Sequence, residues 1–174
     1  MTIDRKQLTD IIEAEHGNNW WKPELFKLKV RPLLPSDLNI VSEPPTPEQN
    51  YNCFVYAFGL QNDPEFLGGK NPVQQEFIQW LILNKVLTPT DTRDAGNLIF
   101  YENERGEITH GGILQDAETV ISKWMWGPSI IHKLMDVPSS FGDKVSFFQS
   151  PGAENIKKKY FAYKDTGVKI KAIG

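Results

Sequence analysis

The first fifty residues combine one stretch of helical periodicity with a long proline-rich segment. Residues 4–15 carry apolar side chains at helical spacing, and Asp4 in front of them is a good N-cap, so a short helix is predicted here. Residues 31–49 contain five prolines, which fix φ and remove backbone donors. This segment is therefore expected to be irregular or extended, as an arm that leads into the core.

The most apolar stretch of the chain follows, at residues 51–59. Its pattern alone fits either a buried strand or the start of a buried helix. Asn52 is a good N-cap and Gly59 a suitable helix end, so we favour a short buried helix. A second helix is predicted where Asn71 caps and Pro72 takes the first helical position ahead of a run of apolar residues.

Beyond this second helix the pattern becomes that of strands separated by polar turns. Strands are predicted at residues 97–101, 108–115, 119–124, 129–134 and 145–149, and one or two closing strands at residues 160–163 and 168–170. Helices followed by an antiparallel meander indicate an α+β fold, with N-terminal helices packed on an antiparallel sheet of about five to six strands.

Composition places the chain among ordinary globular proteins. Its 174 residues fit one compact domain, in which residues 1–50 form the N-terminal helix and arm. The hydrophobic share of 40% is enough for a full core. A net charge of −3 gives no basic footprint for nucleic acid, and the lysines at 157–159 are expected to form a solvated face.

The chain has a single cysteine, Cys53. One cysteine excludes an intramolecular disulfide and a multi-cysteine zinc site, and it suits a reducing compartment. The N-terminus is polar and no long apolar run follows, so we expect neither a secretory signal nor a transmembrane helix, and no membrane partner. These features predict a cytoplasmic protein, with export by a signal-independent route left open.

Cys53 is the first candidate for chemistry because it directly follows the predicted N-cap. Free N–H groups and the helix dipole at that position favour a thiolate. The N–H of Cys53, together with Asn52, is a candidate oxyanion binder in acyl transfer. The alternative is that Cys53 is simply a small buried hydrophobe.

His110 is the second candidate, at the start of a strand after a polar turn. A catalytic histidine can be distant from its nucleophile in sequence while close in space. Gly111 and Gly112 have no side chains, which would leave the imidazole accessible. The alternative is a hydrogen-bonded strand histidine without a catalytic role.

Three stretches together, residues 52–57, 96–101 and 109–113, resemble the NlpC-type and CHAP-type papain-like hydrolases. In those families a cysteine opens a helix, a Gly-Asp-apolar strand follows, and a histidine begins the next strand. The resemblance spans residues 51–122 and implies a papain-like catalytic domain over residues 51–174, with Cys53 as nucleophile and His110 as base. Tyr56-Ala57-Phe58-Gly59, Ser122-Lys123-Trp124 and the later His132 are similar to a small bacterial branch of that group.

The chain departs from the family pattern at two positions. Asn97 stands where aspartate is usual, which mainly affects a turn. The third catalytic position falls on Ser122, which orients an imidazole weakly. His132 hydrogen-bonds better and would approach His110 if strand 129–134 pairs back on strand 119–124. Both residues stay candidates for the third role, and both could instead be ordinary sheet residues.

Trp124 and Trp126 flank the predicted site. Either could wall a substrate cleft, although alternating aromatic side chains on a strand more often belong to the core. The three histidines of the chain are scattered, and residues 67–70 lack the spacing of a phosphate-binding loop, so no metal, nucleotide or other cofactor is expected.

The resemblance implies acyl transfer from an amide or peptide bond through a thioester, with a peptide or protein substrate. Whether the product is hydrolysed or transferred is left open, as is the oligomeric state. The non-standard third position motivates an alternative, a catalytically inactive papain-like binding module. A further alternative is an intracellular toxin or effector protease.

Overall fold

One antiparallel sheet forms the framework of the computed structural model, which describes residues 2–166. Its strands across that range lie in the order β1-β6-β5-β4-β3-β7-β2. They are β1 (Asn39–Ser42), β2 (Thr88–Pro89), β3 (Leu98–Glu102), β4 (Ile108–Leu114), β5 (Thr119–Lys123), β6 (Ser129–Lys133) and β7 (Lys144–Gln149). The predicted α+β class with an antiparallel sheet is confirmed.

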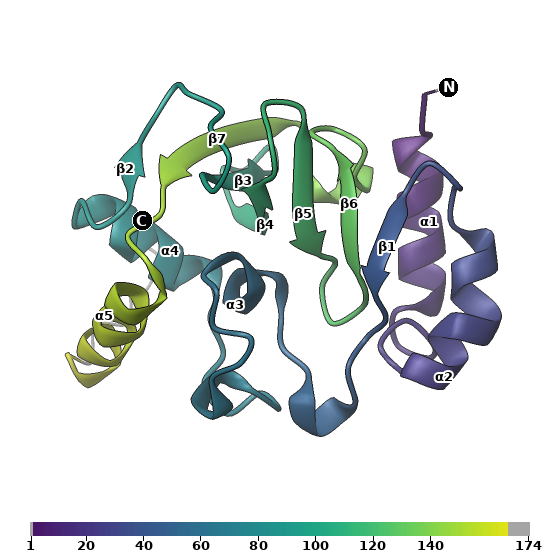
Figure 1. Ribbon diagram of the computed structural model, residues 1–174, viewed down its shortest axis with the longest axis horizontal. Helices are drawn as coiled ribbons and strands as arrows, with labels where there is room; N and C mark the ends of the chain where they lie inside the picture. The colour runs from purple at the N-terminus through teal and green to yellow at the C-terminus, as the bar shows by residue number, and fades with distance from the viewer. Residues whose placement is uncertain (1, 167–174) are drawn as a thin grey trace.

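The helices gather at the two ends of this sheet, except for one short helix near its middle (Figure 1). They are α1 (Arg5–Glu15), α2 (Pro23–Leu25), α3 (Cys53–Ala57), α4 (Gln75–Leu83) and α5 (Ala153–Asp165). Short 3-10 or π turns occur at η1 (Phe26–Val30), η2 (Arg31–Leu33), η3 (Pro47–Gln49), η4 (Pro64–Phe66) and η5 (Ser139–Phe141). Across the described residues, no helix has the length and apolarity needed to span a bilayer.

Two hydrophobic cores lie on opposite faces of the sheet, and β3 contributes to both. Leu98 and Phe100 pack with α3, α4 and α5 on what we call the α3 face. Ile99 and Tyr101 pack with the N-terminal segment on the opposite, α1 face. Burial on both faces explains why β3 reads as a continuous apolar run rather than as an alternating one.

The N-terminal arm is part of this core. β1 lies inside the proline-rich segment and pairs with β6, with Asn39 opposite Ile131. Trp20 and Phe26 are fully buried on the α1 face and pack edge to face, 5.6 Å between ring centroids. Residues 2–50 therefore cover the sheet and do not merely lead into it.

The predicted helix starts are confirmed for two helices and wrong for a third. Asp4 caps α1 by accepting from the N–H groups of Lys6 and Gln7. α4 begins at Gln75 and not at Pro72. The amide of Asn71 is engaged elsewhere, because it donates to the Glu65 carbonyl at 2.8 Å and accepts from Lys164 at 2.6 Å.

The tail differs most from expectation. Residues 160–163 lie in helix α5 and not in a strand, because Ile156 and Tyr160 share one helical face and pack into the α3-face core. The lysines at 157–159 stand on this helix, where Lys157 forms an ion pair with Asp63 at 2.7 Å. The predicted strand at 168–170 lies outside the described residues. β1 and the two-residue β2 were not predicted, and they bring the described sheet to seven strands.

Candidate active site

Cys53 is the first residue of α3, as the sequence predicts. The Asn52 side chain accepts from the N–H groups of Phe54 and Val55, both at 3.1 Å, and so caps the helix. Its amide donates to the Val73 carbonyl at 2.7 Å. Asn52 thus fixes the start of α3 and ties it to the chain before α4. Its side chain is engaged in these bonds, which does not support its predicted role as an oxyanion binder.

Backbone N–H groups surround the sulfur of Cys53. Those of Gly111, Cys53 and Phe54 favour its thiolate form and so lower its pKa, although the Phe54 N–H is also bound to the Asn52 side chain. Gly111 is available for this contact because β4 pairs with β5 only at its last two residues, so the strands separate before Gly111. A Cβ on residue 111 would lie 3.0 Å from the Phe100 ring and 3.3 Å from Phe54. Glycine there lets α3 pack closely on β4.

The charged neighbour of Cys53 is Lys123, at the end of β5. Lys123 is only 1% exposed; its Nζ donates to the Gly127 carbonyl at 2.6 Å and lies 4.6 Å from the centroid of the Tyr51 ring. Burial lowers the pKa of Lys123 to about 7, although the nearby Cys53 opposes this shift. Burial raises the pKa of Cys53 to about 12, opposed by the backbone N–H groups and by Lys123.

Lys123 was not predicted as a site residue, whereas its neighbour Ser122 was. Side chains alternate across a strand, so two adjacent residues of β5 must point to opposite faces. Ser122 points to the α1 face and Lys123 to the α3 face, where Cys53 lies. The sequence feature that could have indicated Lys123 is a lysine in an otherwise uncharged strand, next to the predicted Ser122.

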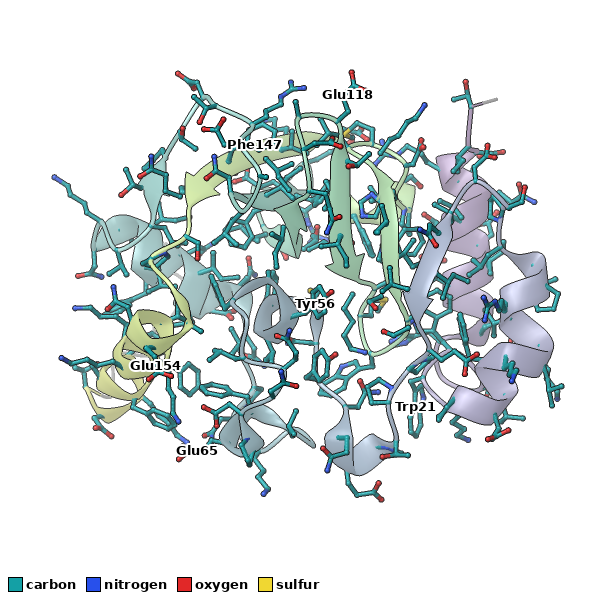
Figure 2. All side chains as sticks on the ribbon, in the orientation of Figure 1. Trp21, Tyr56, Glu65, Glu118, Phe147 and Glu154 are labelled. Atoms are coloured by element: carbon teal, nitrogen blue, oxygen red, sulfur yellow. The ribbon has the colours of Figure 1, made fainter. Side chains whose placement is uncertain are left out.

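Two tyrosines flank Cys53 in the sequence and partly cover its surroundings. The rings of Tyr51 and Tyr56 are stacked, 6.3 Å apart and nearly parallel, and both side chains are half-buried. Tyr56 is labelled at α3 in Figure 2. Cys53 itself is buried and retains 6% exposure.

His110 does not face Cys53, which corrects the predicted pair. His110 lies opposite Tyr101 in the β3–β4 ladder and points to the α1 face. Its ring stacks on Phe141 with centroids 4.2 Å apart, and it is fully buried. Neither ring nitrogen has a hydrogen-bond partner among the described residues. Burial, and then the charge of His132, hold the pKa of His110 well below its usual value.

A β-bulge explains the error. Tyr101 pairs with His110 and the next residue, Glu102, pairs with Ile108, so Thr109 is the extra residue. In a regular strand, Ile108 and His110 would share a face. Ile108 packs on the α3 face, and the bulge places His110 on the other. Sequence spacing gave no sign of this extra residue.

The other predicted site residues gather near His110. β5 pairs with β6 as expected, and the charge of His132 acts on the pKa of His110, so these two histidines are neighbours. The Oγ of Ser122 lies 2.7 Å from Nε2 of His132. Trp124 is fully buried and its Nε1 donates to that Oγ at 3.1 Å, which makes Trp124 a core residue and not a cleft wall.

The proton positions in this cluster follow from its partners. Nδ1 of His132 lies 2.7 Å from the Lys133 carbonyl, which can only accept, so Nδ1 carries the proton. Nε2 of His132 therefore accepts from the Ser122 hydroxyl. Burial lowers the pKa of His132 to about 4, partly opposed by the Lys133 carbonyl. The cluster is a satisfied polar network inside the core, on the opposite face from the thiol.

Comparison with known proteins adds one family. A family model described as "Domain of unknown function (DUF7689)" matches residues 41–149, a span from β1 to the end of β7. That span contains Cys53, Lys123 and the histidine cluster. No curated protein and no solved structure matches the chain.

Proposed function

The chain belongs to the DUF7689 family of unknown function, and from its own side chains we propose that it is a cysteine-dependent acyl-transfer enzyme of papain-like type. Cys53 is the nucleophile in this proposal, and Lys123 replaces His110 as the base. The observation that carries it is a lysine beside the thiol that is only 1% exposed, so that burial lowers its pKa to about 7. A base works best when its pKa is close to the working pH, and burial is a known way to tune lysine to that range.

The proposed reaction begins with a neutral Lys123 amine. The amine takes the proton from the Cys53 thiol while the sulfur attacks the carbonyl carbon of an amide or ester. The carbon–nitrogen or carbon–oxygen bond then breaks, and the leaving group takes the proton from Lys123. Water or an amine next attacks the thioester, its proton passes through Lys123, and the Cys53 thiol is regenerated.

Backbone groups support the charge that develops on the carbonyl oxygen. The N–H groups of Gly111 and Cys53 converge near the sulfur, so they are available to an oxyanion formed there. The papain-like assignment is supported by the position of Cys53, at the start of a helix packed on an antiparallel sheet. In papain-like enzymes the base is usually a histidine on the same side of the sheet as the nucleophile. In this proposal Lys123 takes that role.

Acetylation by p-nitrophenyl acetate tests the proposal, because the leaving group is coloured and the acetyl group marks the sulfur by mass. We expect one acetyl group on Cys53, at a rate that rises as the pH passes through about 7 and Lys123 loses its proton. Lys123→Met keeps the length of the side chain but removes the amine. It should lower the acetylation rate by about 10²–10⁴.

His110→Leu is the matched control, since it changes a buried residue on the other face of the sheet. Its acetylation rate should equal that of the wild type. A wild-type protein that is not acetylated, or a rate that falls in His110→Leu but not in Lys123→Met at equal melting temperatures, would overturn the assignment of nucleophile and base. Release of free acetate, or its transfer to an added amine, distinguishes hydrolysis from transfer.

A second candidate is a non-catalytic papain-like binding module. The raised pKa and deep burial of Cys53 favour it, since both features are typical of a core thiol. In this case neither variant has an effect on acetylation, because none occurs.

A further inference from the structure

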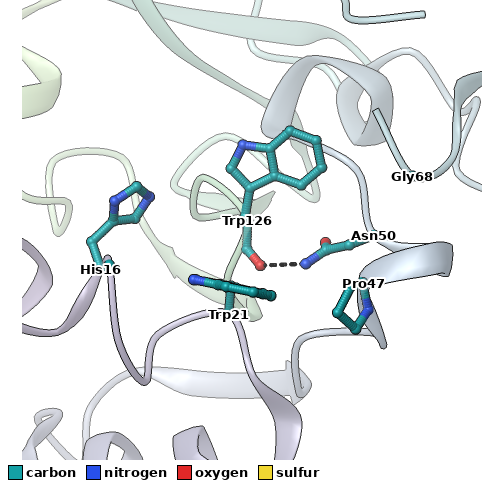
Figure 3. Close-up of a pocket in the computed structure, with 7 residues that line it drawn as sticks. His16, Trp21, Pro47, Asn50, Gly68 and Trp126 are labelled. Atoms are coloured by element: carbon teal, nitrogen blue, oxygen red, sulfur yellow. Dashed lines mark hydrogen bonds between the residues drawn. The ribbon is translucent and has the colours of Figure 1, made fainter. Parts of the chain in front are cut away.

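A pocket of about 310 Å³ lies between the N-terminal segment and the loop after β5. The residues that line it include two tryptophans, Trp21 and Trp126, together with Pro47, Asn50 and His16 (Figure 3). None of these residues belongs to the proposed Cys53 and Lys123 pair. The pocket size falls in the range of small-ligand sites, which are mostly apolar with a few fixed polar groups.

Asn50 holds the walls of the pocket in place. It is 2% exposed, its amide donates to the Trp126 carbonyl at 2.8 Å, and its Oδ1 accepts from the Tyr51 N–H at 2.8 Å. The Asn50 carbonyl also accepts from the Gly68 N–H at 2.9 Å. The pocket is therefore formed before any ligand arrives.

Three ring nitrogens lie at one end of the pocket, and the Asn50 amide lies toward the other (Figure 3). Nε2 of His16 is buried and has no hydrogen-bond partner among the described residues. Figure 3 shows the indole nitrogens of Trp21 and Trp126 on the side that faces His16, with Pro47 at the other end. An unpartnered buried nitrogen is costly, and a ligand with a hydrogen-bonding group would relieve that cost.

Charge argues for a neutral ligand. The residues that line the pocket include no carboxylate to attract a cation. The Lys22 ammonium already lies 5.3 Å from the Trp21 ring centroid, which further disfavours a cationic guest. The one cation on these rings, Lys22, does not line the pocket, so an anion would lose its hydration against two indole rings with little charge compensation.

We propose that this pocket binds a peptide residue with an uncharged ring, either an aromatic residue or proline. The ring lies between Trp21 and Trp126, and the adjoining amide group hydrogen-bonds at the His16 end. Flat rings and prolyl rings both pack well on indole faces, and aromatic-lined sites are a common way to bind proline-containing segments.

The pocket is also close to the proposed nucleophile. Asn50 precedes Cys53 by three residues, so their Cα atoms are at most about 11 Å apart. Trp126 adjoins Gly127, whose carbonyl binds Lys123. Binding of the ring does not require Cys53 to react. Its use as the pocket that selects a substrate residue near the reacting bond rests on the proposed function.

Titration of the Cys53→Ala protein tests binding without chemistry. The probes are the N-acetyl amides of phenylalanine and proline, compared with those of alanine and lysine, and the readout is the indole N–H NMR signals. We expect saturable shifts of the Trp21 and Trp126 signals by the two ring compounds, with Kd of about 1 mM. Trp126→Ala should weaken binding at least about tenfold.

Trp80→Ala is the matched control, because Trp80 stacks on Phe77 in the α3-face core. It should leave binding unchanged. Equal binding of the alanine or lysine compound, or no saturable shift by about 20 mM, would overturn the pocket assignment. If the ring compounds bind but wild-type Cys53 is not acetylated, the pocket assignment holds and the proposed enzymatic function is wrong. If Cys53 is acetylated but the ring compounds do not bind, the proposed function holds and the pocket assignment is wrong.

Discussion

The Ser122 hydroxyl donates to Nε2 of His132 over 2.7 Å, deep in the α1-face core. This bond is the middle of a chain of hydrogen bonds that runs from Trp124 Nε1 through Ser122 and His132 to the Lys133 carbonyl. Every polar atom of these three side chains has a partner. Ser122 and His132 therefore have a structural explanation that needs no reaction.

Removal of the Ser122 hydroxyl should destabilise the fold. Ser122→Ala leaves His132 Nε2 and Trp124 Nε1 buried without partners, at a cost of about 1–3 kcal/mol. Urea unfolding measures the change. Ser146→Ala on β7, where the serine is half-buried, is the control and should stay within about 0.5 kcal/mol. Equal stability of both variants would show that the network contributes little.

Acid should destabilise the protein through His132. Its pKa is about 4 in the folded chain against 6.5 for a free imidazole, so the unfolded chain binds more protons between those values. The contribution of neutral His132 to the stability of the fold is complete above pH 6.5 and is lost as the pH falls toward 4. The difference between these two pKa values corresponds to about 3 kcal/mol of the free energy of unfolding. His110 acts in the same direction.

The measurement is the free energy of unfolding of wild type and His132→Gln across this range. Carboxylates also titrate near pH 4, so the difference between the two proteins isolates the histidine. That difference should shrink as the pH falls, because protonated His132 stabilises the fold no better than glutamine. A difference that stays constant with pH would mean that His132 is not held neutral by burial.

The parts of the fold that follow from local pattern were predictable from sequence. Asn52 and Cys53 define a helix start through capping alone, and the β5–β6 hairpin follows from alternation and turn chemistry. α5 was misread because Tyr160 and its aromatic neighbours also suit a strand. Only its packing against Phe66 and Phe77 settles the choice.

The candidate site was less predictable, because it depends on which face each strand residue occupies. The bulge at Thr109 moves His110 to the α1 face, and no residue in the sequence signals it. Once the register of β5 is known, alternation places Lys123 opposite to Ser122. The proposed nucleophile, Cys53, came from local sequence, and its proposed partner, Lys123, needed the three-dimensional arrangement.

The effect of replacing His110 on the free energy of unfolding distinguishes a core histidine from a catalytic one. His110→Leu replaces a buried ring with two unpartnered nitrogens by an apolar side chain of similar size. The free energy of unfolding should stay the same or rise by about 1 kcal/mol, because replacing an unsatisfied polar group removes its desolvation cost. Urea unfolding at neutral pH measures it. A fall of several kcal/mol would reveal a polar partner for His110 that the described contacts lack.

Alkylation of Cys53 by iodoacetamide tests the state of the thiol itself. Only the thiolate reacts, and burial holds the pKa of Cys53 near 12, so the native protein should react slowly at mildly acidic and neutral pH. Its rate should still be rising at about pH 10, since the thiolate fraction keeps increasing there. The same protein in urea is the control and should react as an ordinary cysteine with a plateau above about pH 9. A native rate that already reaches a plateau below neutral pH would mean that Cys53 rests as a thiolate, and proton transfer to Lys123 would then precede the approach of the substrate.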